Sequence, residues 1–196
     1  MTRLPPPLDL SASVPDLVRE LARHLGATTF VGLCVDLLGG ADRSEHLDAL
    51  PYLTGHDWAP GSPVTDPMSW DDYWVRTWGA RGLLHVWADT ASSAVVAGLV
   101  DEHWRPTEMC LKVTARHEVA GAAEAAAALA AHDLPRVRVQ ALRALGAVGD
   151  TEHVEVVRDA LTDPAPAVRR AAARAVESLV VRLDLSPQAS IELMSP

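Results

Sequence analysis

The sequence predicts an all-α protein, a right-handed α-α superhelix of stacked helix pairs with about ten helices. Two observations predict this class. A pattern of small and apolar residues returns every 31 residues, which is the mark of a helical repeat array. Segments typical of strands, with alternating β-branched residues between turns, are missing. The 196 residues are 48% hydrophobic and 22% charged, which indicates a folded chain and argues against disorder.

The repeat is read from four anchors at residues 75, 106, 137 and 168. A Val-Arg pair stands at three of them, and Pro106-Thr107 replaces it at the second. Positions are counted from the anchor (+0), and positions +0, +4, +7 and +8 lie on one helical face. Small residues at +4 and +7 would let a neighbouring helix approach closely. An acidic residue or a proline precedes each anchor, as is typical of a helix N-terminus.

The segment from Asp163 to Val176 reads Asp-Pro-x-x-x-Val-Arg-x-x-Ala-x-x-Ala-Val and resembles the HEAT repeat. The length of about 30 residues is similar to the HEAT-like subtype first named in phycobilisome lyases. Tyr73 to Ala115 also resembles an actinobacterial HEAT-repeat family of unknown function. The resemblance covers residues 70–183 and implies a HEAT-like solenoid. The second repeat departs from it, and Pro106 predicts that this helix begins one residue later than its counterparts.

Three regions follow from this register. Residues 1–69 are predicted to form a diverged helical cap, with helices at 14–25, 28–38 and 44–53 and a long loop at 55–67. Residues 70–183 hold the 31-residue repeats, whose second helices are expected at 91–100, 120–131 and 151–161. Residues 184–196 form a C-terminal tail. In the first helix of the chain, Ser13 is the expected N-cap and Gly26 the expected end.

The net charge of −9 argues against a general binder of nucleic acid or membrane surfaces. The two cysteines, Cys34 and Cys110, form no CxxC pair, so we expect buried thiols and neither a disulfide nor a zinc site. The N-terminus lacks the apolar stretch of a signal peptide, and no apolar run is long enough to span a bilayer. These features predict a cytoplasmic location.

The register also predicts a partner-binding surface. Position +6 is basic in every repeat, and five of the six tryptophans fall between Trp58 and Trp87. The candidate residues combine this basic column with the tryptophans and neighbouring arginines: Trp70, Trp74, Trp78, Arg81, Trp104, Arg105, Lys112, Arg136, Arg143 and Arg174.

Each part of this surface has a structural alternative. The column is also what a solvated outer helix face would show, since arginine is a good helix former. Tryptophans at i, i+4 and i+8, as in Trp70, Trp74 and Trp78, more often belong to core or cap packing than to a binding site. Arginine at +1, in Arg76, Arg138 and Arg169, belongs to the repeat and is expected to form bonds between repeats.

The sequence contains no HExxH, GxSxG or P-loop motif, and its eight histidines are scattered. We therefore assign no catalytic residue, metal site or cofactor. These observations favour a non-catalytic scaffold that binds a protein or peptide partner, and they leave its oligomeric state open.

The alternative is a nucleic-acid-binding HEAT protein such as the AlkD-like DNA glycosylases. These hold damaged DNA on a concave basic surface with tryptophan and a catalytic aspartate. Trp104-Arg105 after Asp101 is loosely similar, but no catalytic aspartate can be matched.

Overall fold

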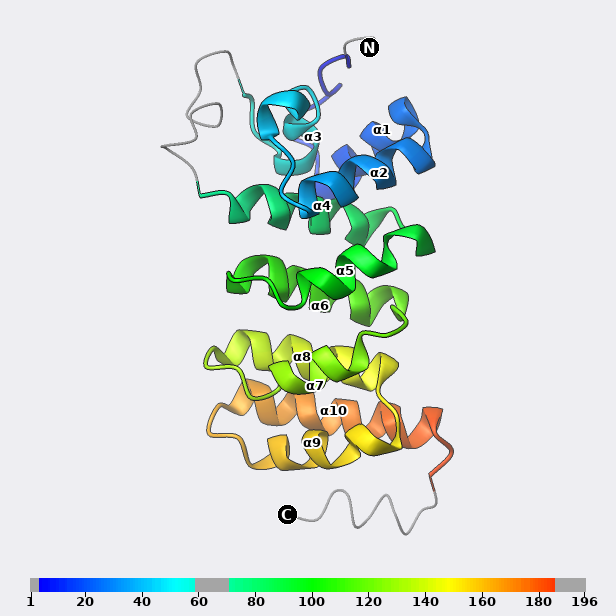
Figure 1. Cartoon of the computed structure of the whole chain (residues 1–196), viewed down its shortest axis with the longest axis vertical. Coiled ribbons are helices and arrows are strands. Elements are labelled where there is room, and N and C mark those ends of the chain that lie inside the picture. Colours follow the sequence, from blue (N-terminus) through cyan, green and yellow to red (C-terminus); the bar gives the residue numbers. More distant parts are fainter. Residues whose placement is uncertain (1–3, 59–70, 186–196) are drawn as a thin grey trace. The chain divides into compact units, whose positions relative to one another are not determined.

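The computed structural model describes residues 4–58 and 71–185, and all regular structure within them is helical. These residues form ten α-helices and short 3-10 turns, which confirms the predicted all-α fold (Figure 1). The chain divides into two compact units, Met1–Ala94 and Val95–Pro196. The predicted boundary at residue 69 falls outside the described residues and stays a prediction.

The N-terminal unit begins with α1 (Val14–Leu25) and α2 (Ala27–Leu38). The Ser13 hydroxyl accepts the Asp16 N–H, which caps α1 as predicted, and Gly26 with φ of 78° separates the two helices. No single helix in the described part of the chain is long and apolar enough to cross a membrane; α1 and α2 meet that test only as a pair, bent by 117°.

The third predicted helix, 44–53, is wrong as a single element. It is split into a 3-10 turn, η1 (Arg43–His46), and a short helix, α3 (Leu50–Thr54). Pro51 lies in the first turn of α3, where its missing N–H costs no helical bond. The proline therefore stands at the start of a helix and not within the single helix predicted for 44–53.

The helix α4 (Tyr73–His85) packs on α2 through two glycines. A Cβ atom added at Gly79 would lie 2.5 Å from the Cys34 carbonyl oxygen and 2.6 Å from the Leu38 nitrogen. At Gly82 it would collide with the Cys34 sulfur. These are the +4 and +7 positions of the first repeat, so the predicted close approach at small residues is confirmed here. The 3-10 turn η4 (Asp89–Ala91) follows α4.

The C-terminal unit contains α6 (Trp104–His117), α7 (Ala123–Leu129), α8 (Pro135–Val148), α9 (Val154–Asp159) and α10 (Pro166–Arg182). The helix α5 (Ser92–Gly98) crosses the boundary between the units. Within this unit α8 packs against both α6 and α10, while α7 and α9 lie in the other layer (Figure 1). Two 3-10 turns, η5 (Thr151–His153) and η6 (Ala160–Thr162), flank α9, so the second helices are shorter than predicted.

The first helices of the four repeats begin at Tyr73, Trp104, Pro135 and Pro166, which are 31 residues apart. The prediction that the second repeat starts one residue late is therefore wrong. His103 caps α6 by accepting the Arg105 N–H on its Nδ1 at 3.3 Å. Pro106 fits the first turn because the N–H groups there have no partner within a helix.

The small-residue stripe forms the core of this unit. The +4 and +7 side chains of α6, α8 and α10 are all buried, namely Cys110, Val113, Ala141, Ala144, Ala172 and Ala175. A Cβ atom at Gly146 would lie 3.2 Å from the Ala175 Cα, which shows how closely α8 approaches α10. Both cysteines are buried free thiols as predicted, and burial raises the pKa of each above its ordinary value.

One of the +1 arginines, Arg138, joins two repeats, as expected. The Arg138 guanidinium binds the Asp163 carboxylate of the next repeat with two bonds, of 2.8 and 2.9 Å. It also donates to the carbonyls of His132 and Asp133 in the turn before its own helix, at 2.9 and 3.1 Å. Arg169 repeats the second pattern, donating to the carbonyls of Asp163 and Pro164 at 2.7 and 3.1 Å. Each of these turns therefore binds a guanidinium group.

Candidate partner-binding surface

The basic column of the C-terminal unit lies on its first helices. Lys112, Arg143 and Arg174 each stand eight residues after the start of α6, α8 and α10. Helices packed in this way have axes about 8–10 Å apart, so equal positions on them form a row. Arg143 and Arg174 are exposed, and Lys112 has 31% of its side chain exposed. The row is therefore accessible at all three positions.

The cations of this row differ in their local partners. The Lys112 ammonium lies 3.1 Å from the Glu108 carboxylate, and Arg143 donates to the Gln140 side-chain oxygen at 3.3 Å. The Arg174 guanidinium forms no hydrogen bond or ion pair with the residues that the structure describes. Charge available to a ligand therefore increases along the row from α6 to α10.

One end of the row is a stack of arginines on Trp104. The guanidinium carbons of Arg105 and Arg136 each lie 4.4 Å from the centroid of its ring. Arg136 also binds Glu108 at 2.8 Å, so this buried carboxylate bridges Arg136 and Lys112. Four candidate residues, Trp104, Arg105, Lys112 and Arg136, are thus brought together.

Glu108 is the residue that the sequence analysis missed in this group. It lies four residues before Lys112, a spacing at which opposite charges meet on a helix, and that signal could have identified it. Its side chain is 9% exposed, so its role is to hold the two cations in place.

The candidate residues of the N-terminal unit are mainly packed inside. Trp78 is only 4% exposed, and its ring lies 5.8 Å from that of Trp58 and 6.4 Å from that of Trp74. Trp58 in turn donates its indole N–H to the Thr54 hydroxyl at 2.8 Å. Trp74 is half-buried, and Trp70 lies outside the described residues. Trp78 is therefore a packing residue, as the structural alternative expected. Of the candidate tryptophans on α4, Trp74 is the one with exposed surface.

Arg81, at the +6 position of α4, also differs from its counterparts. It donates to the Leu53 carbonyl oxygen at 3.3 Å, and burial lowers the pKa of its guanidinium below the ordinary value. Arg81 therefore ties α4 to α3, whereas Arg143 and Arg174 point to solvent from α8 and α10.

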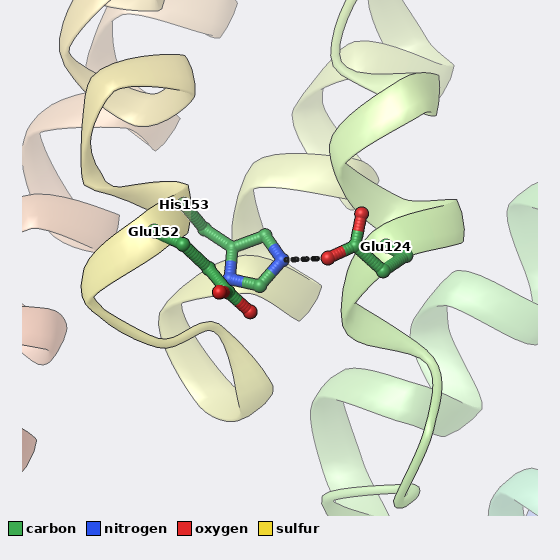
Figure 2. Close-up of side chains that lie close together, drawn as sticks. All are labelled: Glu124, Glu152 and His153. Atoms are coloured by element: carbon green, nitrogen blue, oxygen red, sulfur yellow. Dashed lines mark ion pairs between the residues drawn. The ribbon is translucent and has the colours of Figure 1, made fainter.

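One group of acidic and histidine side chains has the composition of a metal site. Glu124, Glu152 and His153 place ligand atoms within 4.8 Å of one another. Figure 2 shows these three side chains, with the His153 ring facing Glu124. His153 Nδ1 accepts the Asp150 N–H at 3.0 Å, which leaves the proton of the neutral ring on Nε2, and this N–H faces Glu124 at 3.4 Å. A ring held in this tautomer caps η5 and contacts α7, and it does not suit a metal ion.

The fold and this surface define the chain as a helical repeat protein. Residues 122–194 match the family model described as HEAT repeats. The recognition of HEAT-like repeats is thereby confirmed for this part of the chain.

Two further comparisons complete this result. No curated protein matches the chain in sequence. The chain is similar to the crystal structure of an engineered protein, with 21% identity and a TM-score of 0.50 over 92% of this chain and 83% of that one. At that identity the similarity supports the fold alone. HEAT repeats are generally protein-interaction scaffolds.

Proposed function

We propose that the chain is a non-catalytic scaffold that binds a protein or peptide partner in the cytoplasm. The observation that carries the proposal is the exposed row of cations at one register position on α6, α8 and α10, ending at the arginine stack on Trp104. A segment with carboxylates could pair with Arg143 and Arg174 while an apolar side chain contacts Trp104. Trp74 is proposed as a second contact, in the N-terminal unit, where its ring stacks on that of the buried Trp78 and Arg81 ties α4 to α3.

Acidic side chains on the other layer support this choice of face. The exposed residues Glu124, Glu152, Glu155 and Asp159 lie on or beside α7 and α9. The net charge of −9 is therefore unevenly distributed, and the first-helix face of the C-terminal unit is the one suited to an acidic partner.

The test is a charge reversal with a matched control. Partners captured by the full chain from the native cell extract are identified, and their affinities for two variants are measured. Arg143→Glu with Arg174→Glu should weaken binding about tenfold or more, because two attractive pairs become repulsive. Arg19→Glu with Arg23→Glu changes the net charge equally but replaces two exposed arginines on α1, which holds no residue of the row, and it should retain wild-type affinity.

Melting temperature distinguishes a binding role from a structural one. Both double variants replace exposed side chains, so each should stay within about 1 kcal/mol of the wild-type stability. A large stability loss in the Arg143 and Arg174 variant with unchanged affinity would show that the row is structural. A shift of labelled duplex DNA that weakens steeply with salt would instead favour the nucleic-acid alternative.

A further inference from the structure

The turn before each first helix in the C-terminal unit has one design. The side chain at position −5 accepts the backbone N–H of the residue two positions later. Asp101 accepts from His103 at 2.8 Å, His132 from Leu134 at 3.0 Å and Asp163 from Ala165 at 2.7 Å. In the third and fourth repeats, the +1 arginine then places its guanidinium on the carbonyls of this turn.

The second repeat has the turn but lacks the arginine. Its +1 residue is Thr107, which is buried and reaches the carbonyl oxygens of Asp101 and His103 only at 3.5 and 3.4 Å. Arg138 of the third repeat pairs with Asp163, which belongs to the next repeat. The residue at the same repeat position one step earlier, 31 residues before Asp163, is His132. Both members of the Arg138–Asp163 pair are therefore replaced at the step from the second to the third repeat.

A cavity of about 240 Å³ lies at this step. Thr107 and His132, the two replacements, both line it, together with Asp101, Glu102, Trp104 and Leu129. Val100 also belongs to the lining and is 78% exposed, so the cavity reaches the surface. The space that a repeat arginine fills one step further along the chain is open here.

We propose that this cavity binds the arginine side chain of a partner protein, in the place where the next repeats hold their own arginine. The turn offers carbonyl oxygens at the positions that bind Arg138 and Arg169 in the next repeats. Trp104 and Leu129 supply an apolar wall for the methylene stem.

The chemistry favours arginine over lysine. Both repeat turns bind the Nη1 group of their arginine on two carbonyl oxygens, and Arg138 adds Nε and Nη2 on the Asp163 carboxylate. A planar group with five donors can form such a set, whereas an ammonium is a point charge. His132, which stands in the place of Asp163, accepts the Leu134 N–H on its Nδ1 at 3.0 Å. The site shares Trp104 with the candidate surface but contains no residue of the +6 row.

The first test uses N-acetyl-arginine amide as the probe on the full chain. Titration should produce saturable shifts in the backbone amide resonances of Thr107, Leu129 and His132. N-acetyl-lysine amide should bind at least about fivefold more weakly, and the uncharged citrulline analogue should produce no saturable shift. No shift with the arginine probe, or equal shifts with citrulline, would overturn the proposal.

The second test refills the cavity. Thr107→Arg with His132→Asp rebuilds the pair seen between Arg138 and Asp163, so it should abolish probe binding and raise the melting temperature. Thr107→Val keeps the cavity open and should retain binding. Ala128→Met fills the lining without charge and should also abolish binding, which keeps the proposal testable if the double variant does not fold. Probe binding that survives both filled variants would contradict the site.

The two proposals fail separately. Arg143→Glu with Arg174→Glu should retain arginine-probe binding, because neither residue lines the cavity. Loss of probe binding in that variant would place the guanidinium site elsewhere.

Discussion

The N-terminal and C-terminal units hold neighbouring helices together by different means. In the N-terminal unit α4 lies against the backbone of α2, with glycines at the contact and a tryptophan cluster beside it. In the C-terminal unit α8 and α10 pack through alanines, and a buried arginine–aspartate pair joins their turns. The first arrangement depends on the absence of a side chain, the second on the presence of one. Substitutions should therefore damage the units for opposite reasons.

The largest effect is expected at Gly79. Gly79→Val places new atoms against the backbone of Cys34 and Leu38, which cannot move aside as a side chain can. We expect a loss of about 3 kcal/mol in the free energy of unfolding, measured by urea denaturation. Gly32→Ala is the control, because a Cβ there meets nothing within 4 Å and should stabilise α2 by about 0.5–1 kcal/mol. Equal effects of the two changes would refute close packing as the cause.

A smaller effect is expected at Arg138. Arg138→Met removes the cation from a pair whose side chains are only 13% and 11% exposed and leaves Asp163 without its partner. We expect a loss of about 2 kcal/mol, because the carboxylate stays largely buried and unpaired. Arg170→Met removes an exposed arginine from α10 and should change stability by less than about 0.5 kcal/mol. If both variants were equally stable, the pair would contribute nothing to joining the repeats.

The smallest effect is expected when the pH is lowered and Asp163 becomes protonated. The hydrogen bond from Arg138 is the main cause that holds the pKa of Asp163 below its ordinary value of 3.8. The stabilisation from the ionised carboxylate is therefore complete above about pH 4 and is lost as the pH falls through the lowered pKa.

The wild type should accordingly lose more unfolding free energy between pH 6 and pH 3 than the Asp163→Asn variant. Asp159→Asn, at an exposed site on α9, should behave like the wild type. Equal losses in the wild type and Asp163→Asn would argue against this linkage.

The part of the fold that the sequence predicts well is local and periodic. The 31-residue register gives the spacing of the helix starts from Tyr73 to Pro166, because the same small residues recur on one face of each helix. The predicted helix boundaries are wrong near Pro106 and Pro51. A proline suits the first turn of a helix, but the sequence does not show which residue begins that turn.

The candidate surface is less predictable because it depends on where side chains reach. Arg81 and Arg143 share the +6 position, yet Arg81 is held by the Leu53 carbonyl, a contact 28 residues away in sequence. Trp78 shows the same limit, since its burial depends on Trp58 beyond the repeat. The Thr107 departure is visible in the sequence, but the cavity follows only from the distance between the turn and α7.

The double engagement of Arg138 has a consequence for how the array unfolds. One guanidinium binds the turn of its own repeat and the carboxylate of the next, so melting either repeat costs the other a partner. In a linear array such a bond adds to the coupling between neighbours and adds little to the intrinsic stability of each repeat. The third and fourth repeats should therefore unfold together as one cooperative block. The boundary of that block should lie at the step from the second to the third repeat, where Thr107 replaces the arginine.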